Sequence, residues 1–232
     1  VGTTATICVP RGNNPEKNAS MRALGATVVE EGRDYDECVS AMERIARDEG
    51  RVLAHSTNDP RIIAGAGTMM LEILEQAGDG GIDAIVLAIG GGSQAVGALT
   101  VLKRLAPEVE VYGVQAAGAS AQHDSWHART PLTKERADTF AEGVATRSTY
   151  ELTFPALVEG LAGFVTLTDA EVAEGIRLIL STTHNVVEGA GAMGVMGAAK
   201  FREHLTGKRV AVVLCGGNLD STMLRRILNR EM

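Results

Sequence analysis

The stretch Leu87-Ala88-Ile89-Gly90-Gly91-Gly92-Ser93 ends an apolar run and opens a helical pattern. The run covers Ile82–Ile89 and is typical of a buried strand. After Ser93, apolar residues recur at helical spacing as far as Leu102. Glycines in such a loop let backbone N–H groups converge, and the helix N-terminus adds positive potential. The stretch therefore predicts a strand, a loop that binds an anion such as a phosphate, and a helix.

The glycine loop also has a simpler interpretation, a turn that needs glycine only for its bend. A Walker loop is excluded, because no Gly-Lys-Ser/Thr follows. A second strand, Arg209–Leu214, also ends on glycines, at Cys215-Gly216-Gly217-Asn218. Because ligands of open α/β sheets bind beyond the carboxyl ends of strands, we expect both ends to contribute to one ligand site. The alternative for Cys215 is a small buried hydrophobe.

Composition and charge narrow the possible functions. Of the 232 residues, 45% are hydrophobic and 3% aromatic, which predicts an aliphatic core. The net charge of -7 without a basic stripe argues against nucleic acid, and no apolar run reaches membrane-spanning length. Three widely separated cysteines fit reduced thiols better than a disulfide framework or a zinc site. We therefore expect a cytoplasmic protein with neither nucleic-acid nor membrane partners.

Short apolar runs alternate with helical patterns along the chain, which predicts an α/β fold of open, mostly parallel sheets flanked by helices. The segment 117–139 is expected to be mostly irregular. A polar stretch at Ser56–Pro60 predicts a boundary between a smaller αβ domain, residues 1–57, and a larger one, residues 58–232. Strands are expected at Ala5–Val9, Thr27–Val29, Val52–Ala54, Ile82–Ile89, Val109–Val114, Phe164–Leu167 and Arg209–Leu214.

Two further motifs carry weaker signals. Gly189–Gly194 matches G-x-G-x-x-G, but His184–Glu188 is a poor strand, so a closely packed helix start is favoured over a dinucleotide fingerprint. His123 and His127 have the i, i+4 spacing of a metal pair. No third ligand is evident, and a solvated loop is the favoured interpretation. We expect no metal site.

Several segments together resemble the threonine/serine ammonia-lyase (dehydratase) group of fold-type II pyridoxal-phosphate enzymes. The resemblance covers essentially the whole chain and implies a tryptophan-synthase-β-like architecture with pyridoxal 5'-phosphate as cofactor. It also implies a lyase that converts a threonine- or serine-type β-hydroxy amino acid into a 2-oxo acid and ammonia. The segments are Asn58–Thr68, Gly90–Ser93, Phe140–Ala145, Glu188–Ala192 and Cys215–Asn218.

The resemblance also implies the roles of particular residues. Gly90, Gly91, Gly92 and Ser93 would hold the cofactor phosphate. Cys215, beside Gly216, would face the pyridine nitrogen, and Glu142 and Gly143 would line the cofactor. Some relatives carry acidic cation ligands where Gln115 and Ala121 stand, so no divalent cation is expected here. We further expect a homo-oligomer, a dimer or a tetramer.

The chain departs from the family pattern in ways that keep alternatives open. The Schiff-base lysine and the Ser-x-Gly-Asn loop of the family have no counterpart in these residues. We therefore expect an N-terminally truncated member that is inactive alone. The alternatives are a β-replacement synthase or amino-acid racemase of the same fold, a non-catalytic fragment or half of a split enzyme, and an oxidoreductase that uses the Gly189 motif.

Overall fold

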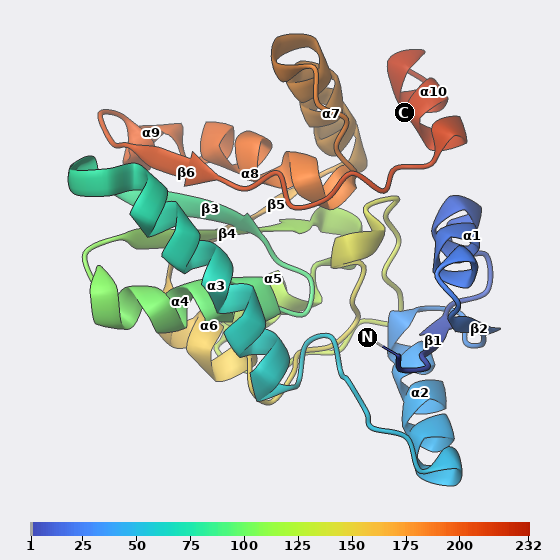
Figure 1. The fold of residues 1–232 in the computed structure, drawn as a ribbon. Helices are drawn as coiled ribbons and strands as arrows, with labels where there is room; N and C mark the ends of the chain where they lie inside the picture. Colours follow the sequence, from blue (N-terminus) through green and yellow to red (C-terminus); the bar gives the residue numbers. More distant parts are fainter. Residues whose placement is uncertain (1) are drawn as a thin grey trace.

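The computed structural model describes residues 2–232 and has two separate parallel sheets (Figure 1). The smaller sheet pairs β1 with β2, and the larger has the strand order β5-β4-β3-β6. The predicted fold class, open parallel sheets flanked by helices, is therefore confirmed. The strands are β1 (Thr6–Val9), β2 (Thr27–Glu30), β3 (Ala84–Ala88), β4 (Glu110–Ala116), β5 (Leu161–Leu167) and β6 (Val210–Val212).

Helices cover both faces of the larger sheet, as Figure 1 shows. On β3, Ile85 and Leu87 pack into one core with α3 and α4, whereas Ala84 and Val86 pack into another with α8. A strand buried on both faces explains why the sequence shows a continuous apolar run without alternation. The longer helices of this unit are α3 (Pro60–Ala77), α4 (Ser93–Leu105), α7 (Asp169–Thr183) and α8 (Gly189–Lys200).

The helices α3 and α4 pack closely because two glycines face each other. A Cβ atom built on Gly97 would lie 2.6 Å from the backbone nitrogen of Gly67. The start of α3 is fixed by Pro60 in its first turn and by Asp59, whose side chain accepts a 2.8 Å hydrogen bond from the N–H of Arg61. This close packing holds α4 against α3, and α4 begins directly after the glycine loop.

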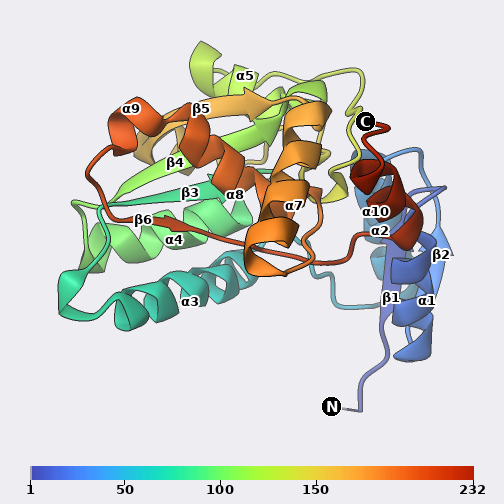
Figure 2. The ribbon, with the colours of Figure 1, turned by 90° about the horizontal axis from the view of Figure 1, so that it is seen from above.

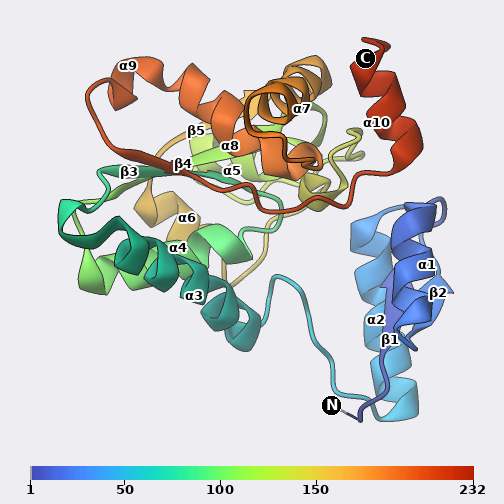
Figure 3. The ribbon, with the colours of Figure 1, turned by 45° about the horizontal axis from the view of Figure 1, so that its top comes forward.

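The smaller unit contains the β1–β2 sheet with α1 (Pro15–Ala23) and α2 (Tyr35–Glu49). A single extended segment, residues 50–59, leads from it to α3 (Figure 2). The last helix, α10 (Ser221–Leu228), lies beside α1 (Figure 3). There the Ser221 hydroxyl donates a 2.7 Å hydrogen bond to Glu16 Oε1. The chain end thus returns to contact the smaller unit.

Two sequence expectations are wrong at the level of secondary structure. Residues 52–54 form no strand, and Val52 is 83% exposed. Within the described residues β1 pairs only with β2, and residues 51–54 line a cavity together with β1 instead of pairing with it. The segment 117–139 contains a helix, α5 (Ala121–Ala128). Its buried face is small or polar, with Ala121, Gln122 and Ser125, so it gives no apolar periodicity.

No helix among residues 2–232 is long and apolar enough to cross a bilayer.

Short elements complete the fold. The remaining elements are α6 (Phe154–Gly160), α9 (Arg202–Leu205) and the single-turn helices η1 (Gly78–Gly80), η2 (Ala117–Ala119) and η3 (Glu142–Val144).

Candidate cofactor site

The glycine loop joins β3 to α4 as the sequence predicts. Gly92 immediately precedes α4 with φ of 98°, a left-handed conformation that favours glycine. None of the four backbone N–H groups of Gly90–Ser93 donates a hydrogen bond to another part of residues 2–232. The Ser93 hydroxyl, in the first turn of α4, has no protein partner there either. These donors lie at the positive end of a 13-residue helix, a position that favours binding of a phosphate.

Two buried side chains hold the glycine loop in place through hydrogen bonds to its backbone. The Thr153 hydroxyl donates a 2.7 Å hydrogen bond to the carbonyl oxygen of Gly91, and Gln122 Nε2 donates a 3.3 Å bond to the same oxygen. Thr153 is fully buried and Gln122 is 1% exposed. Together they fix the orientation of the peptide that follows Gly91. Neither residue was predicted, because neither belongs to a recognisable motif.

Contacts at the glycines bring the predicted segments together. A Cβ atom on Gly90 would lie 2.6 Å from the carbonyl oxygen of Gly143, and one on Gly91 would collide with the side chain of Thr57. A Cβ on Gly143 would lie 3.6 Å from Glu188 Oε1, and one on Gly216 would lie 2.6 Å from the same atom. We call Gly90–Ser93, Glu142–Gly143, Glu188 and Cys215–Gly216 the candidate site.

Cys215 lies beyond the end of β6, next to Gly216. The residue as a whole is exposed, yet burial of its thiol and the nearby Glu188 carboxylate raise its pKa above the usual value. The thiol is therefore neutral at pH 7. The backbone N–H of Glu188 donates a 2.9 Å hydrogen bond to the carbonyl oxygen of Gly216, which fixes the two segments against each other.

Glu142 and Gly143 lie in the single turn η3, on the other side of Glu188. The Glu142 carboxylate is 43% exposed and pairs with Lys17 Nζ at 2.8 Å. Lys17 belongs to α1 of the smaller unit, so this ion pair joins the two units at the candidate site. Lys17 was not expected here. Glu188 belongs to one of the segments that carry the family resemblance, but its position against Gly216 depends on the fold.

The two weaker motifs are accounted for by local structure. Residues 184–188 are not a strand, so the Gly189 motif lacks the strand–turn–helix context of a dinucleotide fingerprint, and it opens α8 instead. His123 and His127 lie on α5, not in the solvated loop expected, with ring centroids 4.4 Å apart. His123 Nδ1 contacts Asp124 at 2.8 Å, and His127 Nε2 contacts the carbonyl oxygen of Phe164 at 3.3 Å. Packing and hydrogen bonding therefore explain both rings.

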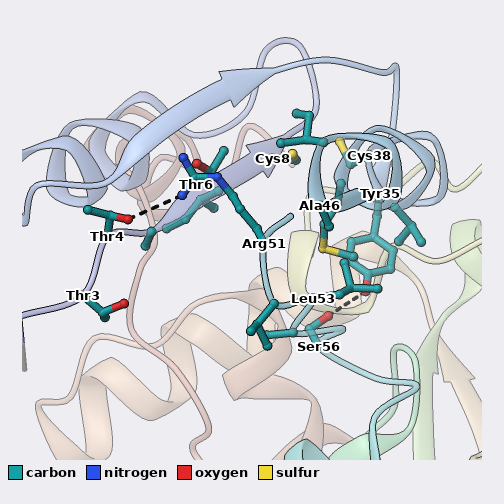
Figure 4. Close-up of a pocket in the computed structure, with 17 residues that line it drawn as sticks. Thr3, Thr4, Thr6, Cys8, Tyr35, Cys38, Ala46, Arg51, Leu53 and Ser56 are labelled. Carbon is teal, nitrogen blue, oxygen red and sulfur yellow. Dashed lines mark hydrogen bonds between the residues drawn. The ribbon is translucent and has the colours of Figure 1, made fainter. Parts of the chain in front are cut away.

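A cavity lies elsewhere in the molecule, away from the candidate site. It has a volume of about 700 Å³ and lies in the smaller unit, between β1, α2 and residues 51–54 (Figure 4). Apolar side chains of α2, such as Val39, Met42 and Ile45, line much of it. None of the predicted site residues lines this cavity, so it is separate from the candidate site.

Comparison with known proteins identifies the family. A family model described as "Pyridoxal-phosphate dependent enzyme" matches residues 1–216. The chain belongs to this family. The free N–H groups of the glycine loop, the Ser93 hydroxyl and the N-terminus of α4 fit the phosphate of that cofactor. The resemblance drawn from the sequence is thereby confirmed, and the family is pyridoxal-phosphate dependent.

Individual family members refine the picture. The chain is 37% identical over 231 residues to an L-threonine ammonia-lyase of Thermotoga maritima, with 100% of this chain and 57% of the relative covered. Processed threonine deaminase isoform 2 of Solanum lycopersicum is similar in structure, with a TM-score of 0.87, 29% identity, and 97% of this chain and 66% of that one covered. A pyridoxal 5'-phosphate-dependent aspartate racemase has a TM-score of 0.89 at 27% identity, with 96% and 69% covered. The chain thus spans just over half the length of its Thermotoga relative.

Proposed function

We propose that a protein of the relatives' full length containing this chain is a pyridoxal-phosphate-dependent ammonia-lyase. Its substrates would be threonine- or serine-type β-hydroxy amino acids, and its products a 2-oxo acid and ammonia. The observation that carries the proposal is the row of unpaired backbone N–H groups at Gly90–Ser93 at the start of α4. The names of the threonine ammonia-lyase and threonine deaminase relatives support the substrate class.

Each part of the candidate site has a distinct proposed role. When bound, pyridoxal phosphate supplies the electron sink for the reaction. The loop Gly90–Ser93 binds its phosphate, while Thr153 and Gln122 keep the loop in place. Cys215 faces the ring nitrogen as a neutral thiol, a weak donor that does not hold a proton there as a carboxylate would. An unprotonated ring nitrogen favours β-elimination over transamination.

Lys17 is the lysine that lies at the candidate site, and its charge state bears on the chemistry. Burial lowers its pKa, but hydrogen bonds and charges of Glu142 and Glu188 outweigh burial, so its pKa is raised overall. Its amine is therefore protonated at neutral pH and is a poor nucleophile. We propose that the 232 residues alone form no covalent bond to the cofactor and are inactive.

An amino-acid racemase is the second candidate, because the aspartate racemase is similar over 96% of this chain. A β-replacement synthase of the same fold is a weaker candidate without a specific observation in its favour. Assaying the full-length protein with L-threonine, L-serine and L-aspartate distinguishes them. Formation of a 2-oxo acid indicates the lyase, and formation of a D-amino acid indicates the racemase.

We also propose that the protein is a cytoplasmic homo-oligomer. We further propose a domain boundary near residue 57, and the extended segment 50–59 supports this boundary.

Cofactor binding by the chain itself tests the site without requiring turnover. Pyridoxal phosphate is titrated and followed by Trp126 fluorescence, with Ser93→Ala and Thr100→Ala compared. Both variants remove a hydroxyl from α4, but Thr100 Oγ1 bonds to its own helix at Val96 O. We expect Ser93→Ala to weaken binding about tenfold, or about 1.4 kcal/mol, and Thr100→Ala to have no effect. Equal affinities would indicate that the loop is only a bend.

Borohydride reduction followed by peptide mapping completes the test. We expect no stoichiometric pyridoxyl adduct on Lys17 or on any other lysine of the chain. A single stoichiometric adduct accompanied by turnover of threonine would contradict the proposal that these residues are inactive alone. Fluorescence quenching by NADH but not by pyridoxal phosphate would instead favour an oxidoreductase.

A further inference from the structure

Lys17 is the cation that joins α1 of the smaller unit to two carboxylates of the candidate site. Its Nζ lies 2.8 Å from Glu142 Oε2 and 3.3 Å from Glu188 Oε2. The Lys17 side chain is 25% exposed and that of Glu188 is 19% exposed, so the pair is largely shielded from water. Shielded charges interact more strongly than those on an open surface.

The position of Lys17 is fixed by its own helix. Asn14 precedes α1, and its side-chain oxygen accepts hydrogen bonds from the N–H groups of Glu16 at 2.9 Å and Lys17 at 3.1 Å. Asn14 Nδ2 donates a 3.1 Å bond to the carbonyl oxygen of Asn218. The start of α1 is therefore tied to the segment that follows Cys215.

Glu188 lies between Lys17 and the backbone next to Cys215. A Cβ atom built on Gly216 would lie 2.6 Å from Glu188 Oε1, and Glu188 Oε2 lies 3.3 Å from Lys17 Nζ. The other charged groups around Lys17 are Glu142 of η3 and Asp220, which lines the same cavity of about 140 Å³ before α10. The Asp220 carboxylate is engaged with the N–H of Met223 at 2.8 Å. Lys17 is thus the cation paired with Glu188 within residues 2–232.

We propose that Lys17 is a positioning residue of the candidate site, which docks α1 onto Glu142 and Glu188 and neutralises the carboxylate beside Cys215. Docking of the smaller unit then sets the charge felt at Cys215. Without Lys17, Glu188 presents an unbalanced negative charge to the thiol, which disfavours the thiolate. The inference rests on the proposed role of Cys215, but its test concerns the thiol itself and needs no cofactor.

The test measures how fast iodoacetamide alkylates Cys215 as pH is varied, resolved by peptide mass spectrometry so that Cys8 and Cys38 do not interfere. Because the thiolate is the reactive form, the midpoint of the pH profile gives the pKa of Cys215. In Lys17→Met we expect this pKa to rise by about half a unit, which slows alkylation at pH 8 about threefold. Lys17→Arg should resemble the unchanged protein.

A double-variant comparison identifies the path of the effect. Glu188→Gln alone should lower the pKa of Cys215 and speed alkylation. Lys17→Met should then raise this pKa by less than it does in the unchanged protein, because Glu188 no longer holds the amine in place. As a matched control, Lys200 pairs with Glu171 away from the candidate site, so Lys200→Met should leave the profile unchanged. Melting temperatures of all variants report whether they fold.

Two outcomes would overturn the inference. A purely structural Lys17 would, when removed, loosen the smaller unit, expose the thiol and speed alkylation, which is the opposite sign. An equal shift of the Cys215 pKa by Lys17→Met with and without Glu188→Gln would show that Glu188 does not mediate the effect. Cofactor affinity of the unchanged chain, measured separately, tells whether the proposed function itself fails.

Discussion

The Thr153 hydroxyl donates a 2.7 Å hydrogen bond to the carbonyl oxygen of Gly91 and is fully buried. Thr153 directly precedes α6, so the bond links this helix to the glycine loop. Because Thr153 and Gln122 both bind the Gly91 carbonyl, they fix the peptide between Gly91 and Gly92, while the N–H groups of the loop have no partner among the described residues. The loop therefore depends on a residue far from it in the sequence.

Replacing Thr153 tests this dependence. Thr153→Val keeps the shape but removes the donor, and we expect it to weaken pyridoxal-phosphate binding about tenfold and to cost about 1–3 kcal/mol of stability. Thr153→Ser keeps the hydroxyl and should retain the affinity. Fluorescence titration and thermal unfolding measure the two effects. Unchanged affinity in a folded Thr153→Val would show that the hydrogen bond does not organise the loop.

The sequence predicted the parts of the site that one local pattern encodes. The strand–glycine–helix transition at Gly90–Ser93 is such a pattern, and the structure places β3, the loop and α4 in that order. Glycine positions and capping residues follow from backbone geometry over a few residues. They can therefore be recognised before the fold is known.

The residues that sequence reasoning missed act across long separations. Thr153 and Gln122 reach Gly91 from 62 and 31 residues away, and Lys17 reaches Glu142 across 125 residues. A threonine, a glutamine and a lysine without a surrounding pattern give no signal, because they are common on any surface. The helix α5 was missed for a related reason, since its buried face is made of small and polar residues.

A second contact between the units makes stability depend on pH. Arg147 Nε lies 2.6 Å from Asp34 Oδ2, and their side chains are 14% and 18% exposed. Burial raises the pKa of Asp34, but hydrogen bonds and the charge of Arg147 outweigh it, so the folded pKa is lowered from 3.8. A lowered carboxyl pKa contributes stability that is present above the unfolded pKa and is lost as pH falls through the folded value.

Asp34→Asn isolates this charge, because asparagine can still cap α2 through the N–H of Glu37. We expect it to destabilise the chain by about 1–3 kcal/mol at pH 7, and progressively less as pH falls below 3.8. Asp48→Asn is the control, since its pair with Arg47 is exposed. Urea unfolding across this pH range measures the difference. A destabilisation independent of pH would contradict the prediction.

The buried Gln115 bears on divalent cations. Its side chain is fully buried, and its Oε1 already accepts a 2.9 Å hydrogen bond from the N–H of His123. Hard cations need oxygen ligands, preferably charged, and Ala121 offers no side-chain oxygen. We expect millimolar Mg²⁺ to leave the melting temperature unchanged. A Mg²⁺-dependent rise that disappears in Gln115→Ala would contradict this expectation.

Cys215 offers the sharpest test of the site's chemistry. If its sulfur faces the ring nitrogen, Cys215→Ser should bind pyridoxal phosphate within about twofold of the unchanged chain, because a hydroxyl is likewise a neutral, weak partner. Cys215→Asp should bring a charge that favours a protonated ring, and the absorption spectrum of the bound cofactor should change. Since Glu188 already raises the pKa of Cys215, the aspartate variant is best compared with and without Glu188→Gln.

If Cys215 is merely structural, Cys215→Ser should instead lower the stability of the chain, because a buried hydroxyl without a partner costs stability. A destabilised Cys215→Ser that binds the cofactor normally would therefore count against the proposed role, and melting temperature with cofactor titration decides between the two.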